Sequence, residues 1–382
     1  MPHYRSVGDI PRKRHTRSPW CEELMGEHGF SGPSSLLYHR RSPSALLSVE
    51  AVDDGRGPPV SNHPLLPRHL RPARMTCGDE PVMGRTVLAA NGHVTLGWWA
   101  GGAASSPLYR NAVGDELAYV QAGSARVDTS FGSIDVAEGD YLVVPATTTH
   151  RWITDDTTQL LFVEAAGGHI DVPERYLTPT GQLREEAPYS ERDVRGPHGM
   201  ADAGADVDEP ADVLVRTRAG LTRQRLAHHP FDVVGWDGCL YPWALNILDF
   251  EPITGRIHQP PPVHQTFAGP RFVVCSFVPR LFDYDPDAVK IPYFHANVDS
   301  DEVIFYSRGD FMSRKGSGIG AASVSLHPSG FTHGPQPGSL EASLDKVRTE
   351  EVAVMVDTFD PLLLSADGLA TEDPEYWRSW SR

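Results

Sequence analysis

The chain carries one spacing of chemistry-bearing residues twice, and this internal repeat restricts its fold more than any other feature. Both copies place an asparagine five residues before a glutamate and a glycine seven residues after it: Tyr109, Asn111, Glu116 and Gly123, then His295, Asn297, Glu302 and Gly309. A frame that recurs in one chain indicates two copies of one structural unit. With 382 residues, at roughly 150 residues per domain, there is room for two.

The composition of the chain and the strand-like runs around both copies predict an all-β protein. The chain has 33 prolines and 35 glycines, which suit many short strands joined by turns. Strand-like runs recur at short intervals, as in 94–99, 141–144, 272–277 and 302–306. Such spacing is typical of a sandwich or barrel.

Changes in composition suggest four segments. Residues 1–85, rich in Pro, Arg, His and Ser, predict an irregular N-terminal arm with a few short strands. Residues 86–177 predict a first barrel, 178–212 an acidic linker, and 213–382 a second barrel with a C-terminal tail.

The net charge and the hydropathy of the chain argue against several kinds of partner. The formal net charge of −16 disfavours nucleic acid and anionic membranes as partners, because both need a positive face. We see no signal-peptide pattern and no apolar run of about 18 residues, so we expect a cytoplasmic protein without a membrane partner. The four cysteines lack C-x-x-C spacing, which argues against a thiolate zinc site.

A second motif follows each glutamate. The first copy has Gly139, Pro145 and His150, and the second has Pro328, Gly330 and His333. Together the two motifs resemble those of cupin β-barrels. The resemblance implies a bicupin, with two jelly-roll-like barrels. One barrel is competent for a metal, and the first is degenerate and without a metal site, because tyrosine and asparagine replace its motif-one histidines.

Spacing places a metal site in the second barrel. Residues 295 and 297 are two apart and share a strand face, and the polar turn 298–301 would return Glu302 beside His295 in a hairpin. His333 would join from a later strand, giving two imidazoles and a carboxylate, the facial triad of non-haem Fe(II). Asp301 is the rival ligand, although its side chain would face the other way on a regular strand.

Other histidines are candidates for the surroundings of this metal. His327, six residues before His333, could position a ligand or the substrate. A proline run, 260–262, predicts a stiff extended loop that could hold His258 or His264 over the site as an acid/base group. The sequence leaves open which of these two histidines acts, and a structural role for each is the alternative.

The second half resembles homogentisate 1,2-dioxygenases, which are bicupin Fe(II) ring-cleaving enzymes. The resemblance rests on Val234–Gly238, Asn246–Phe250, Pro292–His295, Asp299–Glu302, Ser325–His327 and Thr332–Pro335. It implies iron on His295, Glu302 and His333, and deprotonation of the substrate by His258. The family's substrate-contacting tyrosine falls at Phe311, and Arg314 is a nearby cation. The resemblance also implies a homo-oligomer built from trimers.

The expected function is therefore Fe(II)-dependent cleavage of homogentisate, or a related hydroxylated aryl acid, with O2. Such a reaction belongs to aromatic catabolism, and for homogentisate to tyrosine degradation. Two alternatives remain open. One is a metal-dependent cupin isomerase or hydrolase in which the metal acts as a Lewis acid without O2. The other is a bicupin that binds a small molecule without catalysis.

Overall fold

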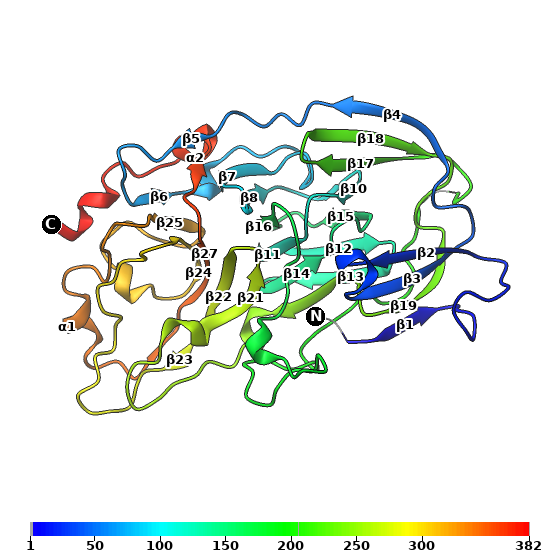
Figure 1. Ribbon diagram of the computed structural model, residues 1–382. Coiled ribbons are helices and arrows are strands. Elements are labelled where there is room, and N and C mark those ends of the chain that lie inside the picture. Colours follow the sequence, from blue (N-terminus) through cyan, green and yellow to red (C-terminus); the bar gives the residue numbers. More distant parts are fainter. Residues whose placement is uncertain (1–2, 205, 382) are drawn as a thin grey trace.

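The computed structural model describes residues 3–204 and 206–381 and is built almost wholly of strands (Figure 1). The helices of the described chain are short: α1 Ser339–Ser343, α2 Ala366–Leu369, and the 3-10 turns His28–Phe30, Pro72–Arg74, Glu174–Tyr176, Ile247–Asp249, Pro261–His264, Met312–Arg314 and Tyr376–Ser381. None of them is long and apolar enough to cross a membrane. The all-β bicupin prediction is confirmed.

Two large sheets form the first barrel. One has the order β13-β12-β15-β10-β17-β18-β4 with β9 beside β15: Gly132–Ala137, Ser124–Thr129, His150–Thr154, Leu108–Asn111, Ala211–Thr217, Gly220–Leu226, Leu46–Val52 and Ala104–Ser105. The other has the order β20-β14-β11-β16-β8-β7-β28-β5: Trp243–Asn246, Asp140–Val144, Glu116–Ala122, Gln159–Ala165, Val94–Ala100, Thr86–Ala90, Leu363–Leu364 and Val60–Ser61.

The second barrel is built on a six-stranded sheet, β21-β22-β27-β24-β25-β6. Its strands are Gln265–Gly269, Phe272–Phe277, Val352–Thr358, Asp301–Arg308, Ser323–His327 and Arg68–Leu70. A small pair, β23 (Arg280–Leu281) with β26 (Arg348–Thr349), adds to it. The strands β24 and β27, in the middle of the large sheet, are buried almost throughout.

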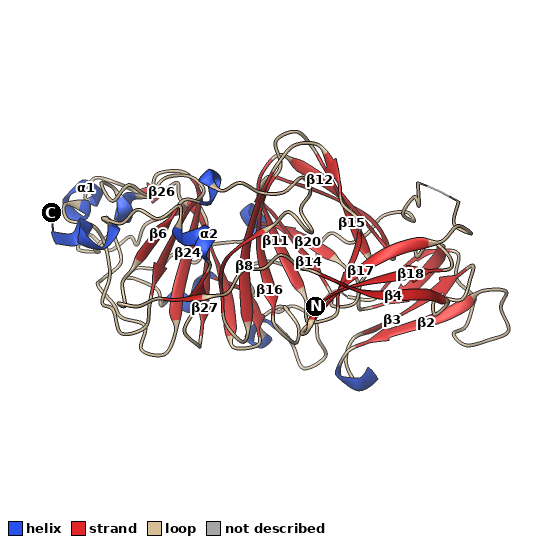
Figure 2. Cartoon of the chain, turned by 90° about the horizontal axis from the view of Figure 1, so that it is seen from above, coloured by secondary structure: helices blue, strands red, loops and turns tan. Residues whose placement is uncertain are grey.

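The eight-stranded sheet that runs from β20 to β5 contributes to both barrels. Alternate side chains of its strands point to opposite faces, so one face packs inside the first barrel and the other packs against the second. Val120 packs inside the first barrel, whereas its neighbour Tyr119 packs against the second, with its hydroxyl 2.7 Å from the Ser307 hydroxyl. Tyr141 repeats this contact, 2.9 Å from the Ser276 hydroxyl. Figure 2 shows the resulting succession of sheets, from β6 and β24 through β8 and β16 to β15 and β17.

The N-terminal region differs from the expected irregular arm. It contributes three strands of a four-stranded sheet, β1-β19-β3-β2 (Arg5–Gly8, Val233–Gly238, Ser34–His39 and Cys21–Gly26), and further strands to each large sheet. The alternation of apolar residues that marks a strand is weak in this region because β4 is exposed along nearly its whole length. The strand β4 is held in its sheet by backbone pairing with β18.

The strands also divide differently from the expected boundary at residue 213. β17 and β18 pair with β10 and β4, and β20 pairs with β14, so residues 211–226 and 243–246 extend the first barrel's sheets. In the second half of the chain, the first strand that joins the sheet of the second barrel is β21, which begins at Gln265. A strand pattern identifies a strand but not its partner, and for this reason the sequence misplaced the boundary.

Candidate metal and substrate site

Backbone pairing brings the predicted ligands together from three parts of the chain. Glu302 lies on β24, directly opposite His327 on β25. His295 and His333 lie outside the named strands and pair with each other, the amide N–H of each donating to the carbonyl of the other at 2.9 Å. The expected hairpin from residue 295 to Glu302 is not formed, because the backbone partner of His295 is His333.

The two histidines present the same nitrogen to the glutamate. Nδ1 of His295 donates to the carbonyl of Tyr293, and Nδ1 of His333 donates to that of Phe331, both at 3.2 Å. A carbonyl can only accept, so each Nδ1 carries a proton, and each Nε2 can bind a metal once it has given up any proton that it shares with Glu302. Nε2 of His295 lies 3.5 Å from Oε2 of Glu302, and Nε2 of His333 lies 3.2 Å from Oε1.

This donor set fits a divalent metal. One ligand atom from each of His295, Glu302 and His333 lies within 4.8 Å of the others. Two imidazole lone pairs and a carboxylate that face one another need a cation between them. Two histidines and one carboxylate with open positions are the set that non-haem Fe(II) oxygenases use.

Electrostatics keep the carboxylate charged. Burial would raise the pKa of Glu302, but hydrogen bonds with His295, His327 and His333 hold it well below its usual range. Nδ1 of His327 donates to Oε1 of Glu302 at 2.8 Å, while the Tyr376 hydroxyl donates to its Nε2 at 3.0 Å. Burial, with the charge of Arg314, lowers the pKa of His327 to about 3, so this imidazole is neutral.

The rival carboxylate has another role. The two oxygens of Asp301 accept hydrogen bonds from the backbone N–H groups of Ser329 and Leu362, both at 2.8 Å. They hold the turn before His333 and the strand end near β28 in place. Glu302, not Asp301, therefore belongs to the cluster with the two histidines.

A cavity of about 370 Å³ opens over the metal cluster and reaches His295 and Glu302. Both candidate acid/base histidines line it. Instead of the expected extended loop, Pro261–His264 forms a 3-10 turn, because proline is tolerated in a first helical turn where its missing N–H has no partner to lose. Either histidine can therefore reach a bound molecule.

The environments of the two histidines differ. Burial, together with Arg280 and His258, lowers the pKa of His264 to about 3. His258 is exposed at the mouth, with Nδ1 4.0 Å from Oδ2 of Asp283 and its ring edge-on to Tyr293 at 5.1 Å. His258 therefore lines the cavity and is also accessible to solvent.

Three residues that were predicted to contact the substrate make their observed contacts with other parts of the protein. Phe311 packs edge-on against Tyr306 at 5.1 Å and is not among the residues that line the cavity. His327 is also absent from that lining and acts on Glu302 from behind. Arg314 does line the cavity, but it donates to the Tyr306 hydroxyl at 2.9 Å and to the carbonyl of Gly334 at 2.7 Å.

A further cation in the cavity, Arg280, has no signal in the sequence. Its guanidinium makes no hydrogen bond or ion pair with any part of the chain that the structure describes, although Glu351 and Asp283 attract it from further away. Burial lowers its pKa. A lone arginine on a two-residue strand carries no sequence pattern, and only the cavity reveals it.

Comparisons with known proteins indicate the family to which the chain belongs. The family model "Homogentisate 1,2-dioxygenase N-terminal" matches residues 82–247, which is the first barrel rather than the half on which the sequence resemblance rested. A protein of Saccharolobus solfataricus assigned as a dioxygenase is 39% identical over 100% of this chain and 99% of its own length. The homogentisate 1,2-dioxygenase of Dictyostelium discoideum is 24% identical over 98% of this chain and 92% of its own length.

Other matches are partial. The homogentisate 1,2-dioxygenase of Nitrobacter hamburgensis is 27% identical over 72% of this chain, and the match spans 63% of that enzyme. Among solved structures, a cupin 2 conserved barrel protein from Leptotrichia buccalis overlaps 76% of this chain and 96% of its own, with 8% identity and a TM-score of 0.37. The description of two barrels rests on the strand pairing given above.

The fold and the site define a bicupin dioxygenase. Within that class, the chain belongs to the homogentisate 1,2-dioxygenase family.

Proposed function

We propose that this protein is an Fe(II)-dependent dioxygenase that opens the ring of homogentisate or a closely related hydroxylated aryl acid. One observation carries the proposal: His295, Glu302 and His333 form a two-histidine, one-carboxylate cluster, and two of its members, His295 and Glu302, line a substrate-sized cavity. Fe(II) held by these three residues would supply open positions for O2 and for the substrate's oxygens.

The cavity offers a partner for the carboxylate of such a substrate. Arg280 makes no hydrogen bond or ion pair within the described chain. Arg314 is held by Tyr306 and Gly334, and Lys290 by the carbonyl of Asp283. A guanidinium can bind a carboxylate with two parallel hydrogen bonds, which also fixes its orientation. Arg280 would thereby set the direction in which the ring points toward the metal cluster.

We assign transfer of the substrate's phenolic proton to His258. It lies at the cavity mouth beside Asp283, so it can take a phenolic proton and pass it to solvent. His264, with a pKa of about 3, is too weak a base for this task near neutral pH. Its neutral ring packs against Phe277 at a tilt of 41°, with ring centroids 4.7 Å apart, and forms part of the cavity wall.

The direct test is O2 uptake by protein that has been reconstituted anaerobically with Fe(II), on addition of homogentisate. We expect one O2 consumed per substrate and loss of the ring's ultraviolet absorption. Glu302→Gln should bind no stoichiometric iron and consume no O2. Asp299→Asn is the matched control, because it changes a neighbouring carboxylate that is exposed and should keep the iron.

Other outcomes would contradict specific parts of the proposal. Iron-loaded protein that consumes no O2 with homogentisate, but does so with gentisate-like acids, would overturn the substrate. Turnover of a substrate without O2 would favour the isomerase or hydrolase alternative. Binding of an aryl acid without turnover under either condition would favour the binding-protein alternative.

A homo-oligomer, built from trimers, and a cytoplasmic location remain part of the proposal. Large apolar side chains are exposed near the cavity mouth, among them Ile257, Tyr284 and Phe294. Surfaces of this kind favour association with another chain. Light scattering of the purified protein would measure the mass of the assembly.

A further inference from the structure

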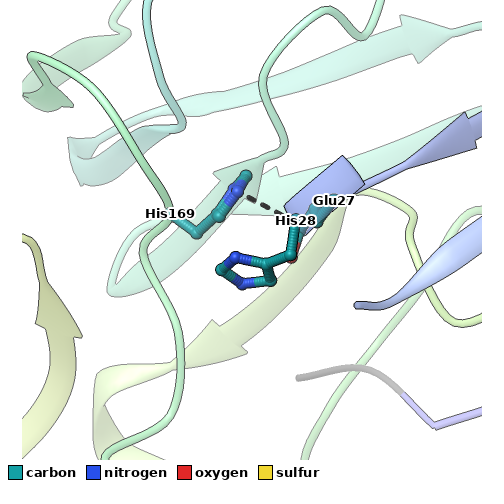
Figure 3. A group of neighbouring side chains, drawn as sticks. All are labelled: Glu27, His28 and His169. Carbon is teal, nitrogen blue, oxygen red and sulfur yellow. Dashed lines mark ion pairs between the residues drawn. The ribbon is translucent and has the colours of Figure 1, made fainter. Parts of the chain in front are cut away.

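A second group of metal-ligating side chains lies far from the catalytic cluster in the fold, where the N-terminal segment meets the first barrel. Glu27 and His28 come from the turn after β2, and His169 comes from the loop after β16 (Figure 3). One ligand atom from each lies within 4.8 Å of the other two. Glu27 Oε1 lies 3.2 Å from Nδ1 of His169, and the rings of His28 and His169 meet edge-on with centroids 5.3 Å apart.

Both sides of this cluster are held by the backbone. In the turn, the N–H of Glu27 donates to the carbonyl of Pro33, and the carbonyl of Glu27 accepts from the N–H of Gly32. Three consecutive residues, His28, Gly29 and Phe30, have positive φ angles of 49°, 62° and 68°, which non-glycine residues rarely adopt. This unusual backbone turns the side chain of His28 toward His169.

His169 is equally well fixed. The N–H of Asp115 donates to the carbonyl of Gly168, and the carboxylate of Asp115 accepts from the N–H of Ile170 at 2.9 Å. Oδ1 of the same carboxylate lies 3.3 Å from Nδ1 of His169. Two carboxylates, Glu27 and Asp115, therefore converge on Nδ1 of His169, where they accept its proton in the absence of an ion, and a metal ion would take the place of that proton.

We propose that Glu27, His28 and His169 form a second metal site, for a divalent ion of the Zn²⁺ class, that fastens the N-terminal turn to the first barrel. Two imidazoles and a carboxylate suit Zn²⁺, Co²⁺ and Ni²⁺. Ligand atoms that lie about 2.0–2.1 Å from a tetrahedral ion are roughly 3.3 Å apart. The 3.2 Å between Glu27 and His169 already matches that separation.

The site's role is structural and independent of the proposed reaction. His28 is exposed and Glu27 and His169 are partly buried, so an ion can enter from solvent without passing through the substrate cavity. The ion would join a segment near the start of the chain to residue 169. Binding only the folded form, it would stabilise the protein in proportion to the logarithm of its concentration.

The experiment uses the full chain with the catalytic cluster disabled, so that the two metals are counted separately. Chelator-treated Glu302→Gln protein is titrated with Zn²⁺ by calorimetry and with Co²⁺ by visible absorption. We expect one equivalent to bind and the melting temperature to rise with Zn²⁺ concentration. His169→Gln and His28→Gln, each added to this background, should weaken binding at least tenfold.

The matched control is His198→Gln, because His198 also pairs with a carboxylate, Asp135 at 3.0 Å, at an exposed position. This variant should bind Zn²⁺ as its parent does. Hydrogen exchange of residues 21–33 should slow on Zn²⁺ addition in the parent and not in His169→Gln. His333→Ala provides a second background should Glu302→Gln not fold. Failure of both backgrounds to bind Zn²⁺, or binding indifferent to His28 and His169, would overturn the proposal.

Discussion

Arg85 donates from Nη1 to Oε1 of Glu116 at 2.9 Å, and Glu116 is the counterpart of Glu302 in the repeated frame. The same nitrogen lies 3.0 Å from Oε1 of Glu164 on the neighbouring strand. The first barrel also keeps a histidine in the second motif, His150, whose Nδ1 donates to the carbonyl two residues earlier, as in His333. In this barrel a guanidinium, held over the Phe162 ring, faces the glutamate.

This ion pair is buried, so removing its cation should be costly. Arg85→Met would remove the cation that Glu116 and Glu164 share and leave Glu164 only its longer pair with Arg56 at 3.4 Å. The loss of one partner of a buried pair costs about 3–5 kcal/mol of unfolding free energy. Urea unfolding would measure the loss. Adding Glu116→Gln and Glu164→Gln should recover part of it, and a loss below about 1 kcal/mol in Arg85→Met would contradict this role.

His327 should tune the metal cluster without binding the metal. His327→Phe removes the hydrogen bond to Oε1 of Glu302. Partners of this kind typically contribute 10–100-fold in metal affinity, so we expect a Kd for Fe(II) that is higher by about that factor. Competition with a chelator would measure it. Tyr376→Phe, which changes only the far side of the imidazole, should have a smaller effect, and equal effects would argue against the direct contact.

Substitutions of the two cavity histidines, His258 and His264, should have different effects on kcat. His258→Gln should keep iron and lower kcat by about 10²–10⁴, the usual contribution of a general base. His264→Phe keeps a flat ring against Phe277 and should change kcat far less. Steady-state O2 uptake at saturating substrate compares them. A larger loss in His264→Phe would reverse the assignment.

A buried histidine near the N-terminus should make stability depend on pH. Nδ1 of His39 lies 2.6 Å from Asp232 and its Nε2 lies 2.9 Å from Glu23. Burial opposes protonation, but hydrogen bonds to these carboxylates raise the pKa of His39 to about 9. A raised pKa means that the stabilisation is complete below the unfolded value of about 6.5 and is lost as pH rises through 9.

The expected size of this loss is on the order of 2–3 kcal/mol between about pH 6 and 10. Urea midpoints of the native protein measured across that range should fall accordingly. His39→Gln should show a smaller decline, because it carries no proton to lose. Parallel pH profiles for the two proteins would exclude His39 as the source.

Much of the catalytic cluster could be predicted because its information is local. The spacing from His295 to Glu302 and the proline-glycine turn before His333 are properties of short segments. The alternation of side chains along a strand also favoured Glu302 over Asp301, and Asp301 indeed accepts backbone N–H groups instead. These choices depend on geometry within a few residues.

The remainder required contacts between distant parts of the chain. His295 takes its backbone partner from residue 333, and strands near residue 211 join the first barrel. Phe311 and His327 are near the site in sequence, yet neighbouring side chains separate both from the cavity. Arg280 and the group of Glu27, His28 and His169 have no motif at all.

The sequence by itself determined the all-β class, the duplicated unit and the residues able to hold a metal, because strand periodicity and ligand spacing are encoded within short stretches. Only the tertiary structure decided that Arg85 faces Glu116 in the first barrel, and that His264 is buried in the cavity wall whereas His258 is exposed. Those outcomes depend on burial and on the pairing of strands far apart in the chain, which local patterns do not specify.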